Sequence, residues 1–236
     1  MVRKPSDLGF SDKGYDLPPL HIHEHVLDST KWSEGYLFPM PAATMQEERA
    51  VKRDSIADRC RAVAKLAEKG SWVIWCELND EADELEKRVK GARQVKGDDS
   101  IFKKEEILDA FADGKLKRLI TKPKIAGFGM NWQHCNNMVI ANLSHSYEQF
   151  YQCIRRCWRF GQERPVNVHV FLMDSESAVL TNIKRKEREA QEMAARMVEH
   201  LKDAMKGEMG ATTRQFVPYE PVKRLQLPTF IKGKSA

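Results

Sequence analysis

The chain has 236 residues, which suffices for one large domain or for a domain with long extensions. Its hydrophobic share of 42% allows a packed core, and its 31% of charged residues favours a soluble protein with a well-solvated surface. No stretch reaches the length of a membrane span, and the N-terminus lacks the apolar core of a signal peptide. The formal net charge of +5 permits nucleic-acid binding without requiring it.

Residues 1–41 hold five of the ten prolines and predict an irregular arm with one extended piece, His21 to Leu27. Polarity and spacing then predict a helix from Thr44 to Glu68, which Gly70 ends as a C-terminal cap. The side chains expected to point inward from this helix are Ile56, Val63 and Leu66.

Strands and helices alternate through the middle of the chain. In order, the sequence predicts a strand at 72–76, a helix capped by Asn79 or Asp80 that runs to about Val89, a weak strand at 93–95, a helix at 101–111, strands at 116–121 and 138–143, a helix at 146–160 and a strand at 166–173. This alternation indicates an α/β fold, a mostly parallel sheet with helices on both faces.

Two segments complete the chain. Residues 176–206 predict a long charged helix, in which a basic cluster at 184–188 is interleaved with glutamates. Residues 207–236 carry three prolines and predict a flexible tail.

The five cysteines, an odd number, show no disulfide-scaffold spacing. They are Cys60, Cys76, Cys135, Cys153 and Cys157. Most fall in predicted helices or strands, so reduced thiols in a cytoplasmic protein are the simplest account. Cys153 and Cys157 lie one helical turn apart, and we interpret them as small core residues rather than as a metal pair.

The run from Gln152 to Gln162 reads Q-x-x-x-R-x-x-R-x-G-Q. At about 100° per residue, one side of the predicted helix carries Tyr147, Phe150, Tyr151, Ile154, Cys157 and Trp158. Gln152, Arg156 and Arg159 fall within an arc of roughly 60° on the opposite side. A guanidinium bonds two phosphate oxygens at once and can stabilise the charge that develops in phosphoryl transfer. Solvated charges opposite a core face remain the alternative.

The segment before this helix adds specificity. It runs from a strand into a loop that holds Gly127 and Gly129, spaced by one, and then Asn131. Glycines let a backbone approach a ligand or adopt positive φ, and Thr121 places a hydroxyl at the end of the strand, where open parallel sheets bind ligands. A tight turn would explain the two glycines alone, but not their combination with the arginine run.

At these residues the chain resembles the second RecA-like lobe of superfamily-two helicases, nearest the Swi/Snf-type and phage-type DNA helicases and translocases. Residues 121–131 look like the family's motif V, residues 152–162 like motif VI with its closing R-x-G-Q, and residues 72–79 lie where motif IV would. The resemblance covers roughly residues 55–175 and implies a single RecA-like lobe.

The resemblance also implies site residues. Arg156 and Arg159 would be the catalytic residues that approach the γ-phosphate of ATP, with Arg159 the arginine finger. Gln152 and Gly127 would complete this lobe's part of the nucleotide site. The residues expected to contact DNA are Thr121, Gly129 and Asn131. The loop continues as residues 133–138 without the acidic residue that the family often has there.

Nothing in the sequence looks like the loop that would hold the nucleotide. The phosphate-binding pattern G-x-x-x-x-G-K-[ST] is absent. The nearest match is Gly114-Lys115, but Leu116 follows it in place of Ser or Thr, and Asp109 stands where the first glycine should be. We therefore expect ATP and Mg²⁺ to be shared with a first, N-terminal lobe, in the same parent chain or in a split partner. The chain alone would be inactive as an ATPase.

These expectations divide the chain into an arm or inter-lobe linker (1–41), the lobe (42–175), a charged helical extension (176–206) and the tail. The extension would be solvated, or would contact DNA or brace the first lobe. The protein would act in the cytoplasm or on the nucleoid. The alternative is a non-enzymatic module that keeps the lobe fold and binds nucleic acid or protein.

Two further patterns invite a functional interpretation. Residues 80–83 spell D-E-A-D, but three residues separate them from the end of the predicted strand. Acidic residues in a first helical turn are ordinary, because they complement the helix dipole. His21, His23 and His25 would share one face of a strand as a possible metal site, although no further ligand is evident.

Overall fold

The computed structural model describes residues 11, 13, 16–27, 50, 52–126, 129–173 and 176–211, with the backbone alone for 177, 178 and 201–211. Its strands are β1 (Leu20–Leu27), β2 (Trp72–Trp75), β3 (Ala92–Gln94), β4 (Arg118–Thr121), β5 (Asn137–Ile140) and β6 (Val166–Met173). Its helices are α2 (Ile56–Leu66), α3 (Asn79–Arg88), α4 (Ile101–Ala112), α5 (Pro123–Ala126), α6 (Tyr147–Ile154) and α7 (Ser177–Ala211).

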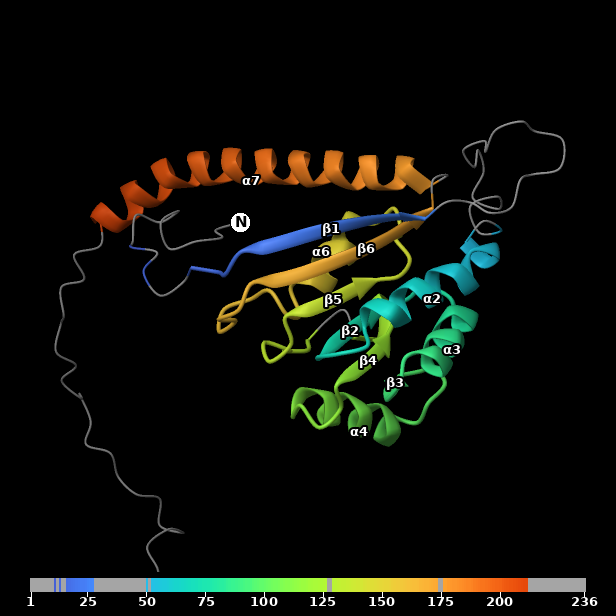
Figure 1. Ribbon diagram of the computed structural model, residues 1–236. Coiled ribbons are helices and arrows are strands. Elements are labelled where there is room, and N and C mark those ends of the chain that lie inside the picture. The colour runs from blue at the N-terminus through green and yellow to red at the C-terminus, as the bar shows by residue number, and fades with distance from the viewer. Residues whose placement is uncertain are drawn as a thin grey trace, which may run out of the picture.

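The six strands form one sheet in the order β1-β6-β5-β2-β4-β3, and every pairing is parallel (Figure 1). This confirms the α/β lobe that the sequence predicts. All four residues of β2 are buried, as expected of a central strand covered on both faces.

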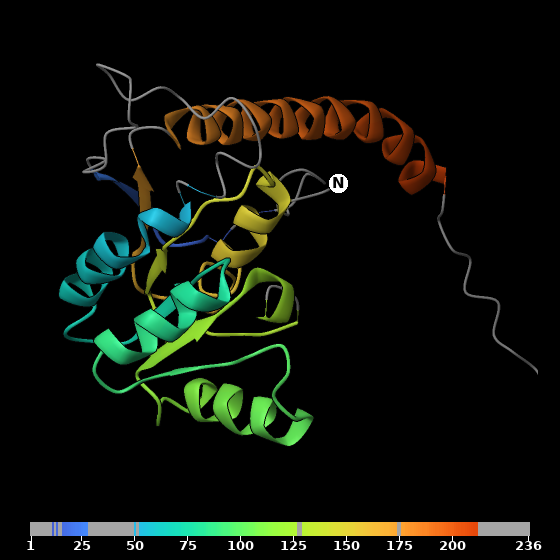
Figure 2. The same ribbon diagram turned by 90° about the vertical axis from the view of Figure 1, so that its right-hand side faces the viewer.

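A hydrophobic core lies on each face of the sheet. On one face, side chains of α4, α6 and α7 pack on the strands, among them Phe111, Phe150 and Ile183. On the other face, α2 and α3 contribute Val63 and Leu85. Beyond its buried start, α7 leaves the lobe and extends past the edge of the sheet (Figures 1 and 2).

The extended piece expected at 21–27 is confirmed, and it has a structural role that the sequence does not show. It forms β1, the edge strand, which pairs with β6 along its whole length from Leu20 opposite Val166 to Leu27 opposite Met173. The N-terminal segment therefore contributes a strand to the sheet of the lobe.

Several helix boundaries differ from the expected ones. In the helix expected at 44–68, residues 44–49 lie outside the described residues, and a turn at Ser55 precedes α2. Val63 is buried as expected, and Gly70 follows with φ of +87°. Helix α7 continues past residue 206 to Ala211, and the remaining expected tail, 212–236, lies outside the described residues.

The expected cap of α3 is wrong. Leu78 occupies the N-cap position without a side-chain hydrogen bond, and Asn79 accepts a hydrogen bond from Lys122 instead. The carboxylate of Glu81 turns back and accepts the backbone N–H of Glu77 at 3.1 Å. Satisfying a free N–H at the helix start in this way is the task that capping residues perform.

Glu81 also belongs to a buried ion cluster that ties three parts of the fold together. Arg59 of α2 lies 3.6 Å from Glu81 and 3.1 Å from Glu176, which precedes α7. Glu176 in turn accepts the backbone N–H of Met173 at 2.9 Å. Burial raises the pKa of Glu81, and the charge of Arg59 opposes that effect.

All five cysteines are free and buried, as expected of reduced thiols. Within the described residues, no helix is both long and apolar enough to cross a membrane.

The histidines of β1 do not form the metal site considered above. Across the described ranges, no three His, Cys, Asp or Glu side chains are placed to hold a metal ion. Instead, the rings of His23 and His25 stack on His169 of the neighbouring β6, with centroids 4.5 and 5.2 Å away.

The basic cluster at the start of α7 is largely engaged within the chain. Lys184 pairs with Glu24 of β1 at 2.6 Å, and Arg185 pairs with Glu189 one turn away at the same distance. Lys186 donates to the carbonyl of His145 at 2.8 Å. The contacts of Lys184 and Lys186 fasten the first part of α7 to the lobe.

Candidate functional site

The arginine run begins on α6 and ends outside it. Ser146 caps the helix by accepting the N–H of Gln149 at 3.3 Å, and the helix ends at Ile154. Beyond it, the N–H groups of Arg156 and Cys157 reach back only three residues, to Cys153 and Ile154, each at 3.2 Å, although Trp158 still reaches back four residues to Ile154 at 2.9 Å. Residues 155–162, here called the arginine turn, therefore form tight turns rather than the last part of a helix.

The prediction of a helix to Phe160 is wrong for a tertiary reason. The carbonyl of Arg156, which a continuing helix would use internally, accepts the N–H of Trp132 at 2.9 Å. The aromatic face is also less buried than predicted. Phe150, Ile154 and Cys157 lie in the core, whereas Tyr147, Tyr151 and Trp158 are half-buried.

Ending the helix early places the two arginines in different surroundings. Arg156 is only 7% exposed, and its guanidinium donates to three neutral oxygens. These are Gln152 Oε1 at 2.9 Å, the Gln152 carbonyl at 3.1 Å and the Met130 carbonyl at 3.1 Å. Burial, and then the charge of Arg159, lowers the pKa of Arg156.

Arg159 lies at the surface. It is half-exposed, and its Nη1 donates to the side-chain oxygen of Asn131. Among the described residues, no carboxylate forms an ion pair with it. Arg159 is therefore the member of the pair that an anion can reach.

A continuous hydrogen-bonded seam joins residues 130–136 to the arginine turn and the start of β6. Besides the arginine contacts, three side-chain amides donate to backbone carbonyls across the seam. These bonds run from Gln133 to Phe160 at 2.9 Å, from Gln162 to Cys135 at 3.0 Å and from Asn136 to Pro165 at 3.0 Å. At the start of β6, the backbone N–H of Asn167 donates to the carbonyl of Asn136 at 2.8 Å. The seam makes the glycine loop and the arginine turn a single structural unit.

The loop residues predicted to contact nucleic acid lie at different depths. Gly129 and Asn131 are exposed, and Gly129 has φ of +81°, a conformation that costs little only for glycine. Gly127 lies outside the described residues. Thr121 is 1% exposed, so its side chain is inside the lobe in this conformation.

Thr121 belongs to a group of buried polar atoms without hydrogen-bond partners. Among the described residues, this group also includes Trp75 Nε1, both amide atoms of Asn142, and atoms of Arg59, Glu81, His134 and Glu176. Trp75, Thr121 and Asn142 stand at or just beyond the carboxyl ends of the adjacent strands β2, β4 and β5. The sequence does give a signal for Asn142, because it interrupts the apolar run 138–143, but we did not predict a role for it.

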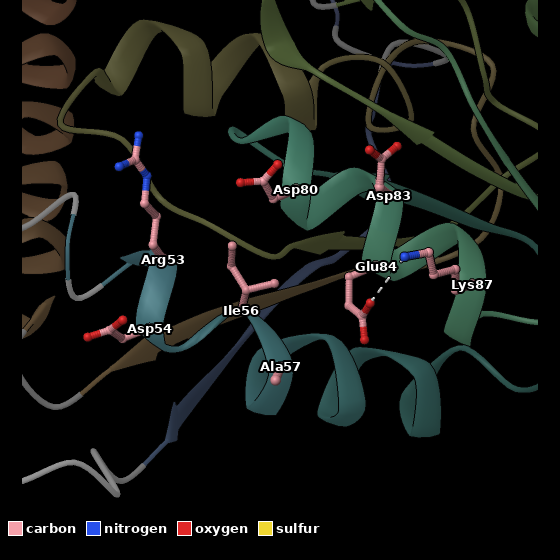
Figure 3. A pocket seen from close by; sticks show the side chains of 8 residues that line it. All are labelled: Arg53, Asp54, Ile56, Ala57, Asp80, Asp83, Glu84 and Lys87. Carbon is pink, nitrogen blue, oxygen red and sulfur yellow. Dashed lines mark ion pairs between the residues drawn. The ribbon is translucent and has the colours of Figure 1, made fainter.

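The D-E-A-D string is divided between the core and the surface. Asp80 and Asp83 line a pocket between α3 and the start of α2, and no residue of the arginine turn lines it (Figure 3). Hydrogen bonds from Lys96 and Gln94 lower the pKa of Asp83, whereas Glu81 is fully buried beside Arg59. These carboxylates do not converge, so the string has the structural role expected of a first helical turn.

Fold and site together define a RecA-like α/β lobe. Residues 54–161, a little less than half of the chain, match the family model described as "Helicase conserved C-terminal domain". A search of curated proteins finds no match.

Several solved structures are similar to this chain at low sequence identity. S. cerevisiae Dbp5 bound to RNA and ADP BeF3 is 18% identical with a TM-score of 0.50, and the match covers 72% of this chain and 39% of that one. The C-terminal domain of the DEAD-box protein Dbp5 is 21% identical with a TM-score of 0.49, covering 55% and 78%. The C-terminal part of the Fun30 ATPase domain is 21% identical with a TM-score of 0.48, covering 53% and 44%.

The chain thus spans less than half of the Fun30 chain and of the RNA-bound Dbp5 chain. The likeness to RNA-bound Dbp5 supports the RecA-like fold.

Proposed function

We propose that this chain is the C-terminal lobe of an ATP-dependent DNA helicase or translocase and that Arg159 is its arginine finger. The observation that carries the proposal is the position of Arg159. It is accessible, lacks a carboxylate partner among the described residues, and is fastened through Asn131 to an exposed glycine loop. An arginine in such a place can stabilise negative charge on a phosphate held from outside this lobe.

The residues present fit a phosphate group. Arg159 offers a planar set of donors whose present partner is one neutral amide oxygen, which an anionic phosphate can replace at a gain in charge-assisted bonding. A first lobe would bind ATP and Mg²⁺ and supply the acidic groups, and Mg²⁺ there would offset charge on the phosphates. Closing the cleft between the lobes would bring Arg159 to the γ-phosphate.

The same movement would act on the nucleic acid. Gly129 and Asn131 are exposed beside Arg159, so we propose that they contact the sugar-phosphate backbone and sense the position of Arg159. Gly127 and Gln152 would complete the nucleotide side of the lobe. Thr121 would act from within the lobe, by supporting the loop that follows β4, because its side chain is buried.

The choice of DNA rests on the motifs at 121–131 and 152–162, which resemble those of Swi/Snf-type and phage-type enzymes. The Dbp5 structure reported above contains RNA. Single-stranded DNA, duplex DNA and RNA must therefore be compared side by side.

ATP hydrolysis by the reconstituted protein tests the proposal. The first lobe would be identified as a Walker-containing segment, upstream in frame or in a neighbouring gene, and joined to this chain. We expect no turnover from this chain alone, and turnover from the joined lobes that DNA stimulates by about tenfold or more and RNA stimulates less.

Robust turnover by the purified chain alone would contradict the division of the active site between two lobes. A joined protein that binds ATP but shows no stimulation by any nucleic acid would favour the non-enzymatic binding module. Stronger stimulation by RNA than by DNA would correct the substrate and leave the lobe assignment in place.

A further inference from the structure

Two consecutive prolines just before β1 contact the arginine turn and the start of β6. The carbonyl of Pro18 accepts the indole N–H of Trp158 at 2.8 Å, and the carbonyl of Pro19 accepts the backbone N–H of Val166 at 2.9 Å. Between these two contacts lie residues 159–165, which carry the second arginine of the motif. The two proline carbonyls therefore hold both ends of that segment.

We propose that residues 16–19, here called the proline strap, position Arg159 by way of Trp158, so that a displacement of the N-terminal segment changes the setting of Arg159. Trp158 directly precedes Arg159 in the chain and is then a positioning residue. The linkage inside the chain follows from contacts within this lobe. Only its effect on turnover rests on the proposed function.

A pair of prolines suits this task because its backbone is stiff. Each ring fixes φ at about −65°, so the two carbonyls keep a nearly constant direction relative to each other. The chain continues from Pro19 directly into Leu20, the first residue of β1, and β1 pairs with β6 along its whole length. The pairing fastens the strap to the sheet, so its carbonyls have a fixed place beside the arginine turn.

Trp158 is restrained at the face of its ring as well as at its indole N–H. The guanidinium of Arg155 lies 5.5 Å from the ring centroid, and the half-buried ring packs against the core on the α6 side of the sheet. Its backbone N–H reaches the carbonyl of Ile154 at 2.9 Å. Because ring and backbone are both held, the backbone of the adjacent Arg159 is restrained with them.

Ordinary packing is the alternative account of the Trp158 bond, because a half-buried indole N–H usually finds an acceptor. Trp72 shows that case. Its indole N–H donates to the carbonyl of Lys69, only three residues away, at 2.6 Å, and its ring lies in the core on the opposite face of the sheet. The acceptor of Trp158 lies 140 positions away in the chain, so this bond ties two separate segments together.

The first test uses the intact chain without nucleotide or nucleic acid, so it does not depend on the proposed function. Trp158→Phe keeps an aromatic ring and removes the N–H that Pro18 accepts, and Trp72→Phe is the matched control. We expect Trp158→Phe to speed amide hydrogen exchange at residues 159–162 and at Val166 by about tenfold, and Trp72→Phe to change it there by less than about twofold. Unchanged exchange at these residues in Trp158→Phe would overturn the proposal.

The second test displaces the strap without altering the arginine turn, and it separates positioning from general stability. Leu20→Ala removes the apolar anchor next to the strap, and Val26→Ala, at the far end of β1 and 59% exposed, is its control. The Nε–H resonance of Arg159, identified by its loss in Arg159→Lys, should shift in Leu20→Ala and in Trp158→Phe and stay in place in Val26→Ala. An Arg159 resonance that does not respond to Leu20→Ala contradicts the proposal, whether or not Trp158→Phe folds.

Turnover by the joined lobes is the readout that rests on the proposed function. Trp158→Phe should lower kcat for ATP hydrolysis by about fivefold or more and leave KM for ATP within about twofold, because Arg159 would act on the transition state. Val26→Ala should keep both values within about twofold. A higher KM at unchanged kcat in Trp158→Phe would contradict a role through Arg159. Joined lobes without any turnover would instead count against the proposed function, and the two tests on the intact chain would still decide the linkage.

Discussion

Arg156 and Arg159 belong to one short motif, and their surroundings differ because α6 ends between Ile154 and Arg156. Helical periodicity places both on one exposed face. In the structure one is buried in a support for the loop and the other lies at the surface. The sequence predicts which residues gather at the site, but not their depth, because depth depends on a contact with Trp132, which lies 24 positions before Arg156 (156 − 132) in the chain.

Removing Arg59 should be strongly destabilising. Arg59→Ala leaves Glu81 and Glu176 buried without their cation, at a cost of about 3–5 kcal/mol in the free energy of unfolding. Urea unfolding of the variant and of the parent chain measures this. Arg61→Ala is the control, because Arg61 forms an exposed pair with Asp58 and should change stability by less than about 1 kcal/mol. Equal losses in the free energy of unfolding for the two variants would show that the buried cluster does not stabilise the fold.

The acidic string at 80–83 should be dispensable for chemistry. Asp80→Asn and Asp83→Asn should keep ATP turnover of the joined lobes within about twofold, since no residue of the arginine turn lines the pocket that they share. Glu81→Gln should lower the urea midpoint, because the buried carboxylate forms an ion pair with Arg59 at 3.6 Å and accepts the Glu77 N–H. A severe loss of turnover in Asp80→Asn, with nucleotide binding retained, would instead assign that residue to catalysis.

At the scale of elements, the apolar runs and the glycines of the sequence predict most of the strands and the ends of several helices. The central strands are found because they are covered on both faces, and Gly70 and Gly114 end their segments with φ of +87° and +73°. The sequence does not predict that β1 belongs to the sheet, because its partner strand begins at residue 166 and no local sequence pattern links the two segments. The short α5 in the loop is likewise absent from the pattern.

The contact between β1 and β6 should weaken in acid. Burial, and then the charges of His23 and His25, lowers the pKa of His169 to about 4, against a usual value of 6.5. The unfolded chain takes up this proton near pH 6.5 and the folded chain only near pH 4. The stability tied to neutral His169 is therefore complete above about pH 6.5 and is lost as the pH falls towards about 4.

Urea unfolding at several pH values tests this expectation. The midpoint should fall between about pH 7 and about pH 5, and His169→Gln should flatten that fall. His21→Gln serves as the control, because His21 is exposed and lies on β1 beyond His23, the nearer neighbour of His169. An unaltered pH dependence in His169→Gln would show that these rings do not govern the acid sensitivity of the fold.

At the scale of the whole molecule, the seam between residues 130–136 and 156–167 is the central feature. It links a loop that faces outward with the turn that carries Arg159, and buried sheet residues support both. A lobe built in this way presents one rigid surface to a partner rather than two independent loops. The sequence motifs predict that the glycine loop and the arginine turn act together, and the hydrogen bonds of the seam provide the physical basis for that coupling.

The most direct test of the account is the effect of Arg159→Ala in the joined lobes. If Arg159 is the arginine finger, the variant should lose about a hundredfold or more in the rate of ATP hydrolysis and bind ATP with nearly unchanged affinity. Lys184→Ala, which removes a cation from the α7–β1 contact, should leave turnover close to the parent value. Unchanged turnover in Arg159→Ala would contradict the assignment of Arg159 and with it the central claim about this site.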